Sequence, residues 1–278
     1  MGNNIKIAYL GPEGTYSYLV AKERFPSLEL INNSAILDVF YFISESSEHK
    51  GIIPIENSSG GPIAESLDLL INNEFDVNIE ESIRLNVKLA LLGRKGVPIK
   101  NIYSHSIPMY HCDLWMRKNL KYASKTAVSS TAKAAELASK EEGSAAIASI
   151  NSASIYNLDV LEYPIEQNIP NTTQFFVISK TAKTPPTGKR IKTSISSFFP
   201  SRPGSLYDFL EPFKNNQINL SRIISRPIHG SPNEYAFFVD IDGSIFEEKI
   251  SDTIEIIKSS GCNLKLICSY KDDLVYNL

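Results

Sequence analysis

Short polar segments rich in glycine and hydroxyl residues stand at the ends of several apolar runs in this chain. "GPEGTYS" (11–17) follows the first apolar run, "PIENSSGGPI" (54–63) follows a later one, and "SSTAKAA" (129–135) opens a helical pattern. Glycine lets the backbone turn tightly, and the amides at the start of a helix can hold an anion. Each segment alone is more often structural than functional. Together, at the ends of parallel strands, they predict a cleft for a small anionic molecule.

Two more polar segments have the same setting. "YSHSIPMYHC" (103–112) closes a predicted strand, and "NTTQF" (171–175) leads into a short apolar run of buried-strand type. A threonine at the start of such a strand either caps the strand or takes part in binding or catalysis at its end. For any single threonine the capping role is the more common one, so we infer a functional role only from the whole set of segments.

The composition narrows the classes of function. A formal net charge of −3 and a sequence pI of about 5.9 provide no basic field for nucleic acid or an anionic membrane surface. Three cysteines at no metal-like spacing predict free thiols in a reducing cytoplasm, and no apolar run is long enough to span a membrane. The histidines are scattered, and GxGxxG, P-loop, GxSxG and HExxH patterns are absent. We therefore expect no metal and no organic cofactor, and chemistry based on hydroxyls, amides and backbone N–H groups.

The predicted elements that must position these groups alternate in the first part of the chain. Strands are expected at 5–10, 27–31 and 51–55, with a helix after each, which predicts a parallel α/β sheet. The pattern changes near residue 77. We expect residues 77–173 to form a second α/β lobe inserted into the first, so that the first lobe comprises about 1–76 plus 174–180.

The C-terminal part follows a different pattern. Residues 181–192 lack apolar periodicity and are predicted to be a linker. After them the order strand, helix, strand, strand, helix, strand predicts a ferredoxin-like βαββαβ unit over 193–278, with its last strand at "NLKLICSY" (263–270).

The ordered set of motifs resembles prephenate dehydratase, and the resemblance covers essentially the whole chain. That family has GPxGTxS, PIENSxxGxV, a Ser-His motif ending in Cys, a Ser-Ser-Thr-Ala helix start and NxTRF, often followed by an ACT regulatory domain. Here they read GPEGTYS, PIENSSGGPI, Ser104-His105 through Cys112, SSTA, and Asn171 through Phe175. The resemblance implies an α/β fold: a two-lobed, periplasmic-binding-protein-like catalytic domain over 1–180 and an ACT domain over 193–278.

The resemblance also implies a reaction and its residues. Prephenate would lose carbon dioxide and its ring hydroxyl to form phenylpyruvate, with no cofactor. The implied catalytic residues are Thr173, Glu56, Asn57 and Ser58, and Thr173 would donate a hydrogen bond to the departing oxygen. The implied substrate-binding residues are Gly11, Gly14, Thr15, Ser104, His105, Ser129, Ser130, Thr131, Asn171, Gln174 and Phe175. L-Phenylalanine would bind between two ACT domains of a homodimer or homotetramer, at Gly204, Ser205, Leu206, Asn219, Leu220, Ser225, Arg226 and Pro227.

Four positions depart from the family pattern, one of them Pro62, where the family usually has a small or hydroxyl residue. The arginine of TRF is Gln174 here, the glutamate of ESRP is Ile224, and the residue before the motif cysteine is His111 rather than glutamine. A glutamine cannot replace the charge and bidentate pairing of arginine. His111 would either recover positive charge near Gln174 or be an ordinary residue on a helix surface.

The sequence therefore leaves several functions open. The favoured one is an active prephenate dehydratase with feedback by phenylalanine. A binding or sensor protein that has lost catalysis is the alternative that Gln174 motivates. Arogenate dehydratase is a further alternative, because arogenate differs from prephenate at one side-chain carbon. A decarboxylase without water loss is disfavoured because Thr173 is present.

Overall fold

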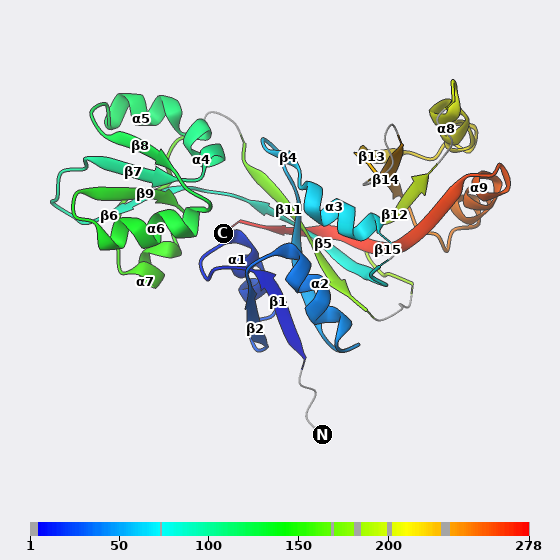
Figure 1. Ribbon diagram of the computed structural model, residues 1–278, viewed down its shortest axis with the longest axis horizontal. Coiled ribbons are helices and arrows are strands. Elements are labelled where there is room, and N and C mark those ends of the chain that lie inside the picture. The colour runs from blue at the N-terminus through cyan, green and yellow to red at the C-terminus, as the bar shows by residue number, and fades with distance from the viewer. Residues whose placement is uncertain are drawn as a thin grey trace.

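The computed structural model describes residues 5–72, 74–167, 170–180, 185–198, 202–228 and 234–277. It has three parts, which lie in a row in Figure 1: a central first lobe, a second lobe on one side and a C-terminal domain on the other. Residues 181–184 of the predicted linker lie outside the described ranges.

The first lobe contains the chain's N-terminal strands and three helices. β1 pairs in parallel with β2 and β3, and β11 runs antiparallel between β3 and β5. The strands are β1 (Lys6–Leu10), β2 (Glu29–Asn33), β3 (Lys50–Asn57), the two-residue β4 (Gly61–Pro62), β5 (Asn78–Asn86) and β11 (Thr172–Ser179), and the helices are α1 (Tyr16–Arg24), α2 (Ile36–Ser44) and α3 (Ala64–Ile71).

The second lobe has a separate five-stranded sheet in the order β10-β6-β9-β7-β8. Its strands are β6 (Ala90–Gly93), β7 (Asn101–Ser104), β8 (Ser124–Ala127), β9 (Ser144–Ala148) and β10 (Asp159–Glu162), and its helices are α4 (Ser106–His111), α5 (Asp113–Asn119), α6 (Thr131–Lys140) and α7 (Ser152–Tyr156). The short β8 has exposed residues throughout and carries no apolar pattern from which the sequence could predict it.

The boundary between the lobes differs from the prediction. Residues 78–86, which were assigned to the second lobe, form β5, and β5 pairs with β11 in the first-lobe sheet. Thr172 and Thr173 also belong to that sheet. The apolar pattern does predict strands here, but it does not say which sheet they join. The strands of the second sheet all lie within 90–162.

The C-terminal domain has the predicted βαββαβ order, with its four strands arranged β13-β14-β12-β15. Its elements are β12 (Ile191–Phe198), α8 (Ser205–Asn215), β13 (Leu220–Pro227), β14 (Tyr235–Asp242), α9 (Glu248–Ser259) and β15 (Asn263–Tyr276). β15 is longer than predicted, because its last residues pair in parallel with β5. The two sheets therefore join into one, and β15 runs from the C-terminal domain alongside β5 in Figure 1.

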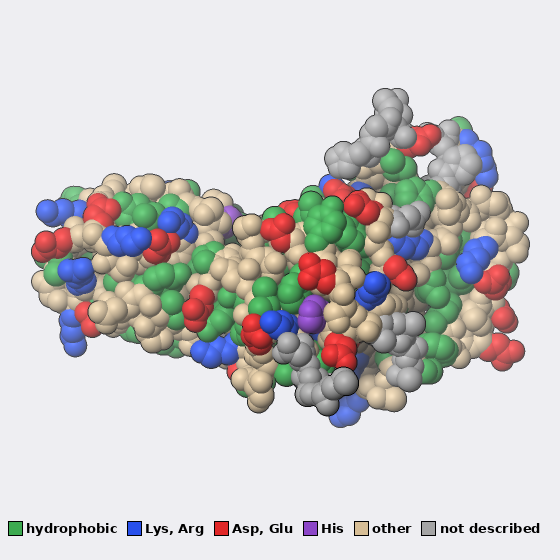
Figure 2. Space-filling view, turned by 60° about the horizontal axis from the view of Figure 1, so that its bottom comes forward, with side chains coloured by type: hydrophobic (Ala, Val, Ile, Leu, Met, Phe, Trp, Pro, Cys, Tyr) green, Lys and Arg blue, Asp and Glu red, His purple; other side chains and the backbone are tan. Residues whose placement is uncertain are grey.

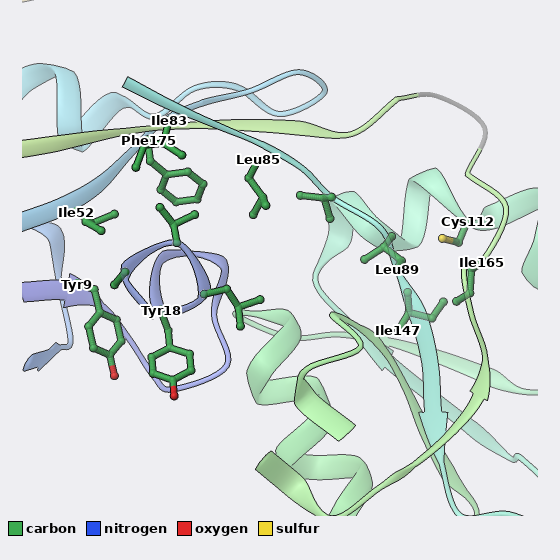
Figure 3. Close-up of a cluster of buried hydrophobic side chains, with 14 of the residues drawn as sticks. Tyr9, Tyr18, Ile52, Ile83, Leu85, Leu89, Cys112, Ile147, Ile165 and Phe175 are labelled. Atoms are coloured by element: carbon green, nitrogen blue, oxygen red, sulfur yellow. The ribbon is translucent and has the colours of Figure 1, made fainter. Parts of the chain in front are cut away.

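Apolar clusters hold the parts together. One cluster runs from Tyr9 and Phe175 in the first lobe to Cys112, Ile147 and Ile165 in the second, as Figure 3 shows. Another joins first-lobe residues such as Phe40 and Ile55 to Phe238 and Tyr270 of the C-terminal domain. Each domain is thus docked on the first lobe by buried apolar surface, which is the main favourable term in such packing.

The surface carries mixed charge. On the face of the molecule that Figure 2 shows, basic and acidic side chains are interspersed. Within the described ranges, no helix combines the length and the apolar character that crossing a membrane would require.

Candidate active site

A cavity of about 820 Å³ brings together residues of both lobes. This volume is typical of a site for a small molecule. Ten of the predicted site residues line it: Gly11, Thr15, Asn57, His105, Ser129, Ser130, Thr131, Asn171, Thr173 and Phe175. The polar segments that the sequence scatters over more than 160 positions therefore meet in one place.

Strand geometry decides which side chains of β3 and β11 enter the cavity. Thr173 stands opposite Asn57 in the antiparallel pair, and Gln174 stands opposite Glu56. Successive side chains of a strand point to opposite faces. Asn57 and Thr173 consequently line the cavity together, whereas Glu56 and Gln174 lie on the other face.

The side-chain amide of Asn57 has a defined orientation. Its Oδ1 accepts hydrogen bonds from the backbone N–H groups of Ser59 and Gly60, at 3.0 and 2.9 Å. Its Nδ2 donates to Oγ1 of Thr173 at 3.0 Å and to Oδ1 of Asn171 at 2.9 Å. Since the Thr173 oxygen accepts from Asn57, the hydroxyl hydrogen is left to donate toward a molecule in the cavity.

Two helix starts face the cavity from opposite lobes. Thr15 caps α1: its hydroxyl accepts from the N–H of Tyr18 at 3.3 Å and donates to the carbonyl of Leu10 at 2.9 Å. Ser130 caps α6 and accepts from the N–H of Lys133 at 3.0 Å. Helix starts carry partial positive charge and unpaired N–H groups, so two of them suit an anion with two acidic groups.

The approach to α1 requires a residue without a side chain. A Cβ atom on Gly11 would lie 1.5 Å from Oδ1 of Asn32. This close approach lets the GPEGTYS turn lie against the end of β2, where Asn32, Asn33 and Ser34 also line the cavity. The sequence reasoning missed these three residues. The sequence did contain a signal for them, because the polar segment "NNS" follows an apolar run, as the other polar segments of the site do.

The surface of the cavity is mostly apolar, with hydroxyl and amide groups set into it, and the described residues that line it include no charged carboxylate, ammonium or guanidinium group. Its one titratable base, His105, has a pKa lowered by burial, and its Nδ1 accepts from the N–H of Ile107 at 3.4 Å. Anion binding here depends on backbone N–H groups, hydroxyls and amides. Nor do the described residues contain a group of three or more His, Cys, Asp or Glu side chains suited to a metal ion.

The cavity lining excludes three predicted substrate-binding residues: Gly14, Ser104 and Gln174. Gly14 has a φ of +88° and faces the side chain of Ile155, so it lies where the two lobes touch. Ser104 is fully buried and donates its hydroxyl to the carbonyl of Ile147 at 2.7 Å. Gly14 and Ser104 therefore belong to the packed structure around the cavity and not to its surface.

Ser58 is also placed away from the cavity. Its hydroxyl donates to the carbonyl of Pro170 at 3.1 Å and accepts from the N–H of Thr172 at 3.0 Å. It ties the end of β3 to the start of β11, which keeps Asn57 and Thr173 side by side.

Glu56 and Gln174 face the C-terminal domain. The guanidinium of Arg222, on β13, donates to Oε2 of Glu56 at 2.8 Å and to Oε1 of Gln174. Nε2 of Gln174 donates to the hydroxyl of Ser82 on β5 at 2.6 Å. The glutamine that replaces the family arginine thus lies at a domain junction and outside the cavity lining.

The alternatives for His111 are both wrong. Its side chain is fully buried in the second lobe, and burial lowers its pKa. It is neither a surface residue nor a cation beside Gln174, because Gln174 contacts Ser82 and Arg222. Two short helices, α4 and α5, meet at Cys112, the residue after His111.

The eight predicted regulatory residues lie at two places. Gly204, Ser205 and Leu206 form the start of α8, and Asn219 precedes β13, where it donates to Oδ2 of Asp242 at 2.6 Å. Leu220, Ser225, Arg226 and Pro227 belong to β13. Arg226 turns toward the first lobe and forms two hydrogen bonds of 2.7 Å with Asp68 on α3.

Comparisons with known proteins agree with this arrangement. Residues 7–183 match the family described as prephenate dehydratase. A bifunctional chorismate mutase/prephenate dehydratase from Pseudomonas aeruginosa is 36% identical over 269 residues, covering 96% of this chain and 73% of the relative. Arogenate dehydratase/prephenate dehydratase 2 from Arabidopsis thaliana is 29% identical over 286 residues, covering 98% of this chain and 74% of the relative.

Solved structures show the same fold. Prephenate dehydratase from Arthrobacter aurescens in complex with L-Phe has a TM-score of 0.85 and 26% identity, over 96% of this chain and 90% of that one. The quorum-quenching acylase GqqA has a TM-score of 0.85 at 22% identity, over 95% and 96% of the two chains, which shows a shared fold alone. With the family match and a relative of 36% identity, the chain belongs to the prephenate dehydratase family.

Proposed function

We propose that this prephenate dehydratase binds prephenate in the cavity between its lobes and that Thr173 assists departure of the ring hydroxyl. The observation that carries the proposal is the Asn57–Thr173 hydrogen bond at the cavity wall. It holds the threonine oxygen as an acceptor and leaves the hydroxyl hydrogen to donate. A threonine is a weak acid in water, so its contribution lies in a positioned hydrogen bond to an oxygen that is becoming hydroxide.

The reaction needs no oxidant. The bond between the ring and its carboxylate breaks, and carbon dioxide leaves. That electron pair enters the ring, the bond between the opposite ring carbon and its hydroxyl breaks, and the ring becomes aromatic. The departing hydroxide takes a proton and leaves as water. A donor that stabilises the developing charge on this oxygen lowers the barrier to the step.

The substrate carries two carboxylates, and the two helix starts would hold them. The α1 start offers the N–H groups after Thr15, and the α6 start offers those after Ser130 together with the hydroxyls of Ser129 and Thr131. Fixed dipoles of this kind also need little rearrangement during the reaction.

The test compares two neighbouring threonines. Thr173→Ala should lower kcat by about 10²- to 10⁴-fold, the usual contribution of a positioned proton donor. Thr172→Ala is the matched control, because the Thr172 hydroxyl donates to Oδ1 of Asn86 at 3.1 Å and does not line the cavity. Phenylpyruvate would be quantified by mass spectrometry after addition of prephenate. Equal losses in both variants would refute the role of Thr173.

Arogenate is the second candidate substrate, because a plant relative carries both activities in its name. It has an ammonium group where prephenate has a keto oxygen. The described residues that line the cavity include no aspartate or glutamate to pair with an ammonium. We therefore propose prephenate as the preferred substrate, and kcat/KM for the two compounds measured on one preparation tests this.

Regulation by L-phenylalanine is proposed for the C-terminal domain, which would act as an ACT domain in a homodimer or homotetramer. Supporting this, β13 is the edge strand of its sheet, and Leu206 and Ile223 expose 40% and 44% of their surface. An edge strand and exposed apolar side chains favour pairing with a second copy. Titration calorimetry and light scattering with added phenylalanine test both points, and absence of binding heat would contradict the first.

A cytoplasmic location also stays a proposal. It rests on Cys112, Cys262 and Cys268, which form no disulfide among the described residues, and disulfides are rare in a reducing compartment.

A further inference from the structure

Arg222 is a buried cation that joins three polar side chains from two domains. Its side chain is 9% exposed. One guanidinium nitrogen donates to Oδ2 of Asp240 at 2.7 Å within the C-terminal domain. The other donates across the domain junction to Oε2 of Glu56 at 2.8 Å and to Oε1 of Gln174.

The C-terminal side of this contact is firmly held. Asp240 is fully buried and accepts a hydrogen bond from the hydroxyl of Ser194, and the hydroxyl oxygen of Tyr270 lies 3.3 Å from the same Ser194 oxygen. Burial raises the pKa of the Asp240 carboxyl, and the charge of Arg222 opposes this effect. Burial also acts against the charge on Arg222, but Asp240 and Glu56 outweigh it and raise the pKa of Arg222. The guanidinium is therefore an oriented part of the domain.

The first-lobe side of the contact lies directly behind the reaction site. Glu56 and Gln174 oppose each other on β3 and β11, and the next pair along the same two strands is Asn57 and Thr173. A shift of either strand that moves Glu56 or Gln174 also moves the neighbouring cavity residue. Hydrogen-bond geometry at a reacting centre tolerates little displacement, since about 1 Å can cost about 10²-fold in rate.

We propose that Arg222 is a positioning residue through which the C-terminal domain sets the alignment of Thr173 and Asn57 for turnover. The inference rests on the proposed role of Thr173. It assigns to a residue of the C-terminal domain a task in the basal reaction, and it gives that domain a direct mechanical connection to the hydroxyl donor.

Other contacts keep the C-terminal domain docked when this one is removed. β15 pairs with β5, a shared apolar cluster lies between the domains, and Arg226 binds Asp68 through two hydrogen bonds. Loss of Arg222 should therefore change the alignment of the site more than the attachment of the domain. Asp68→Asn supplies the matched control, because it breaks the Asp68–Arg226 pair, which is the same kind of interdomain contact away from Asn57 and Thr173.

The experiment compares Arg222→Met with Asp68→Asn in the full-length enzyme, using kcat, KM and thermal unfolding. We expect Arg222→Met to lower kcat by about 10- to 100-fold with KM changed less than about threefold, because the helix starts that hold the carboxylates are untouched. Arg222→Lys should recover part of kcat, and Asp68→Asn should leave kcat near the wild-type value.

Several outcomes would overturn the proposal. Equal losses of kcat for Arg222→Met and Asp68→Asn would mean that only docking matters, and an unchanged kcat in Arg222→Met would mean that the contact has no role. If Arg222→Met does not fold because Asp240 is left buried and unpaired, Arg222→Met combined with Asp240→Asn removes both charges, and the same comparison applies to it. Thr173→Ala is measured beside them: full activity there would refute the site assignment, separately from the effect of Arg222.

Discussion

The side-chain amide of Asn57 donates to the hydroxyl of Thr173 over 3.0 Å, between residues 116 positions apart in the chain. β3 and β11 place the two residues opposite each other, and two backbone N–H groups fix the direction of the amide. The polarity of this pair, with nitrogen toward threonine, decides what the threonine can do. It leaves the hydroxyl hydrogen to donate into the cavity, where we propose that the substrate binds.

Reversing this polarity should abolish most activity. In Asn57→Asp the threonine hydroxyl would donate to the new carboxylate, so it would no longer donate to the leaving oxygen, and a negative charge would face an anionic substrate. We expect kcat/KM to fall by about 10²-fold or more. Steady-state rates measure this. Asn86→Asp, which keeps an acceptor for the hydroxyl of Thr172 outside the cavity, serves as the control and should change the rate little.

The α6 start should matter for both stability and binding. Ser130→Ala removes the cap that accepts from the N–H of Lys133, and the lost cap should lower the free energy of unfolding by about 1 kcal/mol. KM should rise because the helix start would be less ordered. Ser139→Ala in the same helix is the control, since its hydroxyl bonds only to the carbonyl of Glu136 within the helix. Denaturant unfolding and KM values for both variants test this, and a Ser130→Ala enzyme indistinguishable from Ser139→Ala would contradict it.

Two departures from the family pattern should depend on each other. Along β13 the side chains of Arg222, Ile224 and Arg226 face the first lobe, and Ile224 packs on the shared apolar cluster. Gln174→Arg would place a second guanidinium beside Arg222 and should lower the free energy of unfolding by about 2 kcal/mol, as badly placed charges commonly do. Adding Ile224→Glu supplies an anion on the same face and should restore at least half of that loss.

Ile223→Glu is the matched control for this pair. Ile223 is on the outer face of the same strand and is 44% exposed, so a glutamate there adds the same charge without reaching the domain junction. Equal rescue by Ile223→Glu and Ile224→Glu in chemical denaturation would show that only net charge matters and that the two departures are independent.

Stability should decline in mild acid. Burial lowers the pKa of His105 and of His111 below the ordinary value of 6.5. Below about pH 6.5 the unfolded chain binds protons that the folded chain does not, so stability is full above that pH and falls as the pH drops toward the lowered folded-state values. Thermal unfolding between about pH 5 and pH 8 measures the slope. The double variant His105→Gln, His111→Gln should flatten it, and a slope of the opposite sign would refute the assignment.

Much of the site could be predicted from local sequence. The turns at GPEGTYS and PIENSSGGPI, the caps Thr15 and Ser130, and the strand that begins at Thr172 are local features set by residue type and spacing. The βαββαβ order of the C-terminal domain follows from periodicity in the same way. These features depend on interactions between residues a few positions apart, so the sequence determined them.

The tertiary structure decided which faces and which sheets these elements use. The sequence shows that successive side chains of a strand alternate between two faces, but it does not show which face lines the cavity. The sequence therefore could not tell that Asn57 and Thr173 line the cavity whereas Glu56 and Gln174 do not. Likewise β5 joins the first sheet through hydrogen bonds to residues about ninety positions away, and β15 extends to meet it. The guanidinium behind the site comes from Arg222, far along the chain, because long-range pairing rather than local pattern places it there.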